Sequence, residues 1–139
     1  GNAKYPGSPD LVRYKGLFEL NTFDEFENYG ARMSGWITAP TSGNYNFFMS
    51  SDDGGAFYLS TDANPANRAT IARVNAWTSW KEWTKETNQQ SAPIPLVSWR
   101  PAHEQQVLAV ASASAAAMSR FSVPVTVTMS VAMRAPRRR

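Results

Sequence analysis

The amino-acid sequence predicts an all-β domain with antiparallel strands, either a sandwich or a barrel. Short runs in which apolar and polar side chains alternate recur along the chain, as expected for half-buried strands. Turn-forming residues separate these runs roughly every ten residues, which is typical of such folds. The chain has 139 residues, enough for one domain that buries its own core.

The first thirty residues have the character of a loop. The stretch "YPGSPD" is rich in turn-forming residues. Asn21 or Thr22 is suited to cap a short helical turn over residues 23–26. We expect the regular part of the fold to begin near Ala31.

Two alternating runs follow, with a turn between them. In "ARMSGWITA" (31–39) Met33 and Ile37 share one face, and in "YNFFM" (45–49) every second residue is again large and apolar. Pro40, Ser42 and Gly43 supply the turn. Strands joined in this way predict a β-hairpin.

The middle of the chain predicts further strands over residues 56–60 and 69–74, on either side of a polar loop that contains Pro65. Three tryptophans then occur at a spacing of three, which suits a helical turn or a twisted loop: Trp77, Trp80 and Trp83. Residues 91–99 resemble the start of another strand, weakened by two prolines that cannot donate a ladder hydrogen bond.

The composition changes after Trp99. Six alanines and three serines occupy the eleven positions 109–119, which predicts a helix near 102–118. A strict alternation of Val or Met with small or polar residues then predicts a strand near 121–133, before a tail that ends in three arginines.

Composition also excludes several functions. The chain has no cysteine, so it forms no disulfide and uses no thiolate chemistry. No apolar run reaches the roughly 18 residues that span a bilayer. No phosphate-binding glycine loop or zinc-ligand spacing occurs. His103 is the only histidine, so a Ser-His-Asp triad would depend on it. The chain begins at Gly1 without a methionine or a signal peptide, so we expect a trimmed N-terminus.

Charge is unevenly distributed. Residues 1–97 carry a net charge of −2 and residues 98–139 a net charge of +5. Such an asymmetry indicates either a basic arm that binds nucleic acid or two parts of different origin. Because most of the chain is slightly acidic, we expect no nucleic-acid partner.

The central block resembles a known family. "APTSGNYNF", "SSDDG", "LSTDANPANRATIA" and "EWTK...QQSAPI" occur in this order within about residues 9–97. They closely resemble the fourteen-kilodalton domain of the anthrax protective antigen, here called the PA-fourteen domain. The resemblance implies a jelly-roll-like β-sandwich that serves as a module of a larger secreted or surface protein. Glycosidases, adhesins, proteases and toxins contain such modules.

The resemblance also implies a site. Sugar-binding members of the family hold calcium through two consecutive aspartates joined by a cis peptide, and the calcium coordinates sugar hydroxyls. Asp52 and Asp53 match these aspartates. Gly54 and Gly55 are suited to bend the backbone close to a ligand. Calcium takes six to eight oxygen ligands, and carboxylates supply both oxygen and charge. Asn64 and Asn67 are further candidates for sugar contacts.

The resemblance ends near residue 97. Family members continue with a tyrosine-rich strand, a glycine-rich stretch ending in aspartate and a final strand, and none of these is present here. If the preceding third bases are G, the codons of Ala115, Ala116, Ala117 and Met118 read Gly-Gly-Gly-Asp when the frame starts one base earlier. We therefore divide the chain into residues 1–97, the main part of a PA-fourteen-type sandwich, and residues 98–139. The second part is divergent, either frame-shifted or a genuine C-terminal variant with its own helix and strand or a disordered tail.

These observations favour a non-enzymatic module that binds carbohydrate or mediates adhesion outside the cell or at its surface, with calcium as its cofactor. The expected partners are a glycan and other domains of a larger protein, without membrane insertion. The alternative is a structural spacer, or a truncated copy that binds no ligand, in which Asp-Asp-Gly is an ordinary turn. The three tryptophans are suited either to stack on sugar rings or to fill the core and its rim. Asp52, Asp53, Glu82 and Glu86 are candidates for paired acid catalysis by residue type alone.

Overall fold

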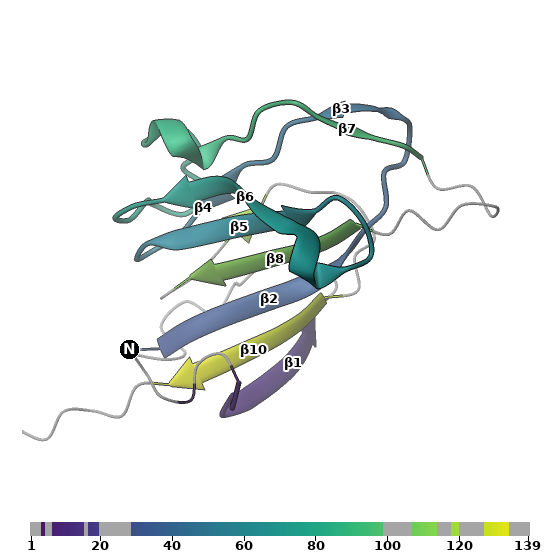
Figure 1. Ribbon diagram of the computed structural model, residues 1–139. Coiled ribbons are helices and arrows are strands. Elements are labelled where there is room, and N and C mark those ends of the chain that lie inside the picture. The colour runs from purple at the N-terminus through teal and green to yellow at the C-terminus, as the bar shows by residue number, and fades with distance from the viewer. Residues whose placement is uncertain are drawn as a thin grey trace, which may run out of the picture.

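A computed structural model of the chain describes residue 4 and residues 7–15, 17–19, 29–98, 107–113, 118–119 and 127–133. Over these ranges the protein is all-β, as predicted. Its largest element is a six-stranded antiparallel sheet with the order β1-β10-β2-β8-β5-β6 (Figure 1). The strands of this sheet are β1 (Leu11–Lys15), β2 (Tyr29–Ile37), β5 (Gly55–Ser60), β6 (Arg68–Val74), β8 (Val107–Ala113) and β10 (Val127–Met133).

Alternation along the strands gives this sheet one buried face. In β2 every second residue from Tyr29 to Ile37 is buried, and the residues between them are partly exposed. Phe57 and Leu59 of β5 and Ala72 and Val74 of β6 are buried with them. Together they form the sheet side of a single core cluster. The predicted strands over 56–60 and 69–74 are therefore confirmed.

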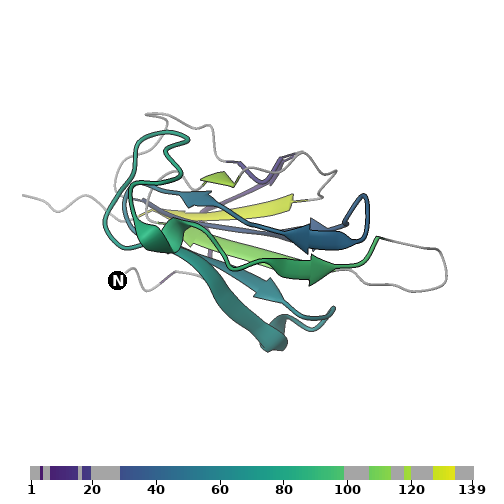
Figure 2. The same cartoon turned by 90° about the horizontal axis from the view of Figure 1, so that it is seen from above.

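The other side of the core comes from two short strand pairs. β3 (Gly43–Tyr45) pairs with β7 (Ile94–Leu96), and β4 (Met49–Ser50) pairs with β9 (Met118–Ser119). Phe47 and Met49 are buried in the same cluster as the sheet residues, and the Phe47 ring meets the Phe57 ring edge-on at 5.7 Å between centroids. Seen from above, β3 and β7 lie over the large sheet (Figure 2). The all-β class is confirmed, and a complete two-sheet sandwich stays a prediction.

The hairpin predicted over residues 31–49 is wrong. β2 pairs with β10 and β8, whereas β3 pairs with β7. The intervening residues 38–42 carry the chain out of the large sheet and into the layer above it. The turn chemistry was correctly recognised, but a turn between two strands does not specify that they pair.

The helix predicted near 102–118 is also wrong. Residues 107–113 form β8 and residues 118–119 form β9. β8 lies between β2 and β5 and is in register with both over most of its length. Pairing with two neighbours overrides the helix propensity of alanine, which is a weak local preference. Positions 102–106 and 114–117 lie outside the described residues.

The predicted strand near 121–133 is confirmed over its second half as β10, and residues 121–126 lie outside the described part of the chain. β1 adds a strand within the first thirty residues, where a loop was expected. The proposed cap at Asn21 or Thr22 falls outside the described residues. Because β10 lies between β1 and β2, the sheet draws strands from both sides of residue 97. Among the described residues, no helix is long and apolar enough to cross a membrane.

Candidate functional site

The two aspartates lie in the loop between β4 and β5, at one end of the large sheet. Both are exposed, and the peptide bond between them is cis, as the family resemblance implies. The loop is fastened to the segment after β6. The Thr78 amide donates to the Ser51 carbonyl at 2.7 Å, and the Ser51 amide donates to the Thr78 hydroxyl at 3.0 Å. Asp52 also forms a β-bridge with Trp77.

Gly54 lets this loop lie directly against the end of β6. A Cβ atom at this position would lie 3.0 Å from the Asn75 carbonyl oxygen and 3.3 Å from that of Val74. Both neighbours are backbone atoms, so they have little freedom to move away. Gly55 begins β5 opposite Val74. The close approach at Gly54 is to β6, so the prediction that Gly54 and Gly55 bend the backbone towards a ligand stays a prediction.

Glu86 organises the segment opposite the aspartates. Its carboxylate accepts hydrogen bonds from the backbone amides of Asn75 at 2.7 Å and Ala76 at 3.1 Å. These bonds favour the charged form, so they hold the pKa of the Glu86 carboxyl below its ordinary value. The Glu86 amide in turn donates to the Gln89 side-chain oxygen at 2.6 Å, within a capping box at the short helix η2 (Thr87–Gln89).

Gln89 anchors η2 in the core. Its side chain is fully buried, and its Nε2 donates to the carbonyl oxygens of Met49 at 2.9 Å and Glu82 at 2.5 Å. One residue thus ties η2 to the strand that leads into the aspartate loop. The sequence did not single out Gln89, because an amide among polar neighbours carries no local sign of burial.

Two of the tryptophans lie at the surface near this loop. Trp77 is 50% exposed and Trp80 is 39% exposed, whereas Trp83 is partly buried. The Lys85 ammonium lies 2.9 Å from the centroid of the Trp77 ring, and the Lys81 ammonium lies 5.1 Å from that of Trp80. Trp77 and Trp80 therefore do not fill the core, and stacking on sugar rings stays a prediction. The bridge to Asp52 places Trp77 beside the aspartates.

Asn64 and Asn67 do not join this site. They lie in the loop after β5, at the opposite end of that strand, and the six residues of β5 span about 20 Å. Asn64 caps the short helix η1 (Pro65–Asn67) by accepting from the Ala66 amide at 3.0 Å. The Asn67 amide donates to the Asp62 carboxylate at 2.7 Å. Both side chains thus form hydrogen bonds within their own loop, away from the aspartates, and their role as sugar contacts stays a prediction.

Two of the four carboxylates considered for acid catalysis have structural partners. The Glu82 carboxylate accepts from the Ser79 amide at 2.8 Å, and Glu86 accepts the two bonds described above. Within the described residues, no group of three or more His, Cys, Asp or Glu side chains is placed to hold a metal ion. Calcium binding by Asp52 and Asp53 stays a prediction.

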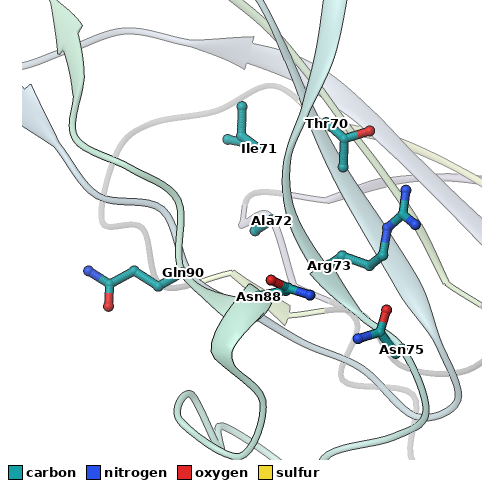
Figure 3. A pocket seen from close by; sticks show the side chains of 7 residues that line it. All are labelled: Thr70, Ile71, Ala72, Arg73, Asn75, Asn88 and Gln90. Carbon is teal, nitrogen blue, oxygen red and sulfur yellow. The ribbon is translucent and has the colours of Figure 1, made fainter.

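A polar depression adjoins the aspartate loop, and sequence reasoning did not predict it. It has a volume of about 290 Å³ and lies between β6 and η2 (Figure 3). It is lined by Thr70, Ile71, Ala72, Arg73, Asn75, Asn88 and Gln90. Asn75 is shared by the two features, because its side chain lines the depression and its carbonyl oxygen faces Gly54.

Comparison with known proteins gives one partial likeness. No family model matches the chain, and no solved structure matches it. Over 86 residues the chain is 36% identical to N-acetyl-beta-glucosaminyl-glycoprotein 4-beta-N-acetylgalactosaminyltransferase 1 of Mus musculus. The match covers 59% of this chain and 8% of the mouse protein. The chain is thus similar to a small part of a glycosyltransferase.

Proposed function

We propose that this chain is a carbohydrate-binding or adhesion module of the PA-fourteen type, belonging to a larger extracellular or cell-surface protein and without enzymatic activity of its own. The observation that carries the proposal is the Asp52–Asp53 pair, exposed at the end of the sheet and fastened there through Ser51, Gly54 and Thr78. The partial likeness to a glycosyltransferase that acts on glycoproteins supports a glycan-related role.

The chemistry of the loop suits calcium. Asp52 and Asp53 offer four carboxylate oxygens to solvent, and hard cations prefer such ligands. Backbone carbonyls, waters and sugar hydroxyls would complete the sphere of six to eight oxygens. When bound, calcium would link the two carboxylates to neighbouring hydroxyl groups of a sugar. Because few protein oxygens are available, we expect weak calcium binding, with dissociation constants of about 10⁻⁴–10⁻³ M, as in extracellular modules.

The face of the Trp77 ring that Lys85 does not cover is suited to receive a sugar ring. Its indole is half-exposed beside Asp52, and flat aromatic side chains offer a large apolar surface at a low cost in entropy. The name of the mouse relative describes an enzyme that acts on N-acetyl-beta-glucosaminyl glycoproteins. Glycans that contain N-acetylated hexosamines are therefore the first ligands to test.

Thermal unfolding with and without calcium tests the proposal. A ligand that binds the native state stabilises it by RT ln(1 + [L]/Kd), about 2.7 kcal/mol at a hundredfold excess over Kd. We expect ten-millimolar calcium to raise the Tm of the wild type, and Asp52→Asn/Asp53→Asn to abolish that rise. Asp62→Asn is the matched control: it removes an exposed carboxylate from the opposite end of β5 and should leave the calcium-dependent rise intact.

A glycan array with calcium and then with chelator separates this proposal from the alternative, a structural spacer. Binding that chelator and the double aspartate variant both remove would support the module. A calcium-independent Tm together with an empty array would favour the spacer. Release or transfer of sugar from N-acetylated glycans by the purified chain would contradict the absence of enzymatic activity.

A further inference from the structure

The depression between β6 and η2 has polar walls and an apolar base. Asn75 and Asn88 supply carboxamide groups and Thr70 adds a hydroxyl, whereas the Gln90 side chain extends away from Asn88 (Figure 3). Ile71 and Ala72 contribute the apolar part of the lining. Arg73 is the only charged residue in the lining, and its guanidinium extends toward β5 rather than toward Asn88 (Figure 3). The walls therefore suit an uncharged polar group that carries a small apolar end.

The backbone that carries Asn75 and Asn88 is held in place before any ligand arrives. Asn88 is the middle residue of η2, whose next residue, Gln89, is bonded into the core. Gln89 thus points inward while Asn88 and Gln90 are exposed on either side of it. Asn75 is fixed through its backbone amide, which donates to Glu86 at 2.7 Å.

These bonds leave hydrogen-bonding capacity facing the depression. The Asn75 side chain lines the depression with an amide oxygen that can accept a hydrogen bond. Between described residues, no hydrogen bond uses the side-chain amides of Asn88 or Gln90. In Figure 3 the Asn88 amide extends from η2 toward Asn75 and β6. One acceptor and one complete amide thus lie on facing walls.

An acetamido group matches this arrangement. It has one N–H donor, one carbonyl acceptor and a methyl group. The donor suits the Asn75 oxygen, the acceptor suits the Asn88 NH₂ group, and the methyl group suits Ala72 and Ile71. A volume of about 290 Å³ lies at the lower end of the roughly 300–1,000 Å³ typical of ligand pockets, so it accommodates one sugar residue rather than a larger ligand.

We propose that the depression is a second subsite, which binds the acetamido group of an N-acetylated hexosamine next to the sugar held at the aspartate loop. The inference rests on the proposed function and specifies its ligand further. The depression and the aspartate loop adjoin each other at Asn75, which supports the proposal. The Asn75 carbonyl lies against Gly54, and the Asn75 side chain lines the depression. An oligosaccharide can therefore occupy both places at once.

A pair of matched disaccharides tests the subsite. N,N′-diacetylchitobiose and cellobiose share their β-1,4 linkage, and only the first carries acetamido groups. We expect the wild type, in millimolar calcium, to bind diacetylchitobiose at least fivefold more tightly in ligand-observed NMR titrations. Asn88→Ala should lower that affinity about fivefold, as expected for one lost hydrogen bond, and should remove the preference over cellobiose.

Two further variants make the result specific. Asn44→Ala removes an equally exposed asparagine from β3 and should change neither affinity. Asn88→Asp keeps the size of the side chain but removes its donors, and should weaken diacetylchitobiose binding as much as alanine does. Because Asn88 is exposed, all three variants should unfold at the wild-type temperature, which a thermal scan checks.

The outcomes separate this inference from the proposed function. Equal binding of the two disaccharides by the wild type, or an unchanged preference in Asn88→Ala, overturns the subsite. If Asp52→Asn/Asp53→Asn abolishes that same binding, the proposed function stands without the subsite. Failure of the wild type to bind either disaccharide or any glycan on the array overturns both.

Discussion

The candidate site depends on the lack of a side chain at Gly54. The loop that carries the aspartates lies against the end of β6, and the two carbonyls nearest to Gly54 belong to that strand and to the residue after it. Any Cβ atom must push the loop or the strand aside. The position of Asp52 and Asp53 relative to Trp77 and Asn75 therefore depends on this glycine.

We predict that Gly54→Ala destabilises the protein by about 1–3 kcal/mol, the usual cost of inserting a group into a closely packed place. Gly43→Ala is the control, because a Cβ atom there would meet nothing within 4 Å. Urea unfolding in the absence of calcium measures both. Equal stabilities for the two variants would contradict the close packing of the aspartate loop.

Glu86 gives the site a pH dependence. Hydrogen bonds from the Asn75 and Ala76 amides lower the pKa of its carboxyl in the folded state. Its contribution to stability is therefore complete above the ordinary glutamate pKa of about 4.3. That contribution is lost as the pH falls from there toward the lower folded-state pKa. Lowering the pH through this range should loosen the segment after β6.

We expect Glu86→Gln to reduce this acid-sensitive contribution, because an amide keeps one acceptor oxygen but does not titrate. Thermal unfolding measured between about pH 7 and pH 3, on either side of the ordinary glutamate pKa, should show a shallower loss of stability for the variant. Asp62 also has a lowered pKa, caused first by the Asn64 amide and then by Asn67, so part of the acid sensitivity should remain. An identical pH profile for variant and wild type would argue against the role of Glu86.

At the scale of elements, η2 joins the core to the surface. The helix has only three residues, so its own hydrogen bonds cannot hold it in place. The Gln89 side chain supplies the missing contacts by reaching Met49 and Glu82, while the Glu86 amide bonds to the same side chain. The position of Asn88 beside β6 follows from this anchor.

Gln89→Ala should cost about 2–4 kcal/mol, because it leaves buried backbone groups of Met49 and Glu86 unpaired and opens a cavity. Gln90→Ala changes the exposed neighbouring amide and should cost little. Thermal or urea unfolding compares them. If the two variants are equally stable, Gln89 does not anchor the helix.

At the scale of the whole molecule, the sheet depends on its C-terminal strands. β8 pairs with β2 and β5, and β10 pairs with β1 and β2. Without β8 and β10, the strands β1 and β2 have no partner left in the sheet, and β5 pairs with β6 alone. The backbone groups along the edges that become exposed then lose their hydrogen-bond partners. A chain that ends at residue 98 would retain the β5–β6 and β3–β7 pairs but not the sheet.

We therefore predict that residues 1–98 alone do not fold cooperatively. The full chain should show a sigmoidal urea transition and dispersed amide resonances in NMR, and the shortened chain should show neither. A shortened chain that folds as well as the full one would contradict the assigned sheet order. Sequencing the coding DNA separately decides whether residues 98–139 are read in a shifted frame.

The sequence by itself determined the features that local chemistry controls. Alternating apolar side chains predicted β2, β5 and β6, because the side-chain period of a strand is two wherever one face is buried. Pro93 and Pro95 predicted a weak strand, and β7 has a single partner strand, the short β3. The Asp-Asp-Gly-Gly stretch was recognised as a loop by its composition and by its likeness to a family.

Only the tertiary structure decided which of these elements meet. The alanine-rich β8 lies between β2 and β5, and β2 does not pair with β3 after the turn that follows it. Trp77 lies beside Asp52 and Asn88 lies near Asn75, whereas Asn64 lies at the far end of β5. The alternation of side chains within a strand does not indicate which distant strand it pairs with. The free energy of pairing comes from contacts that exist only after the chain has folded.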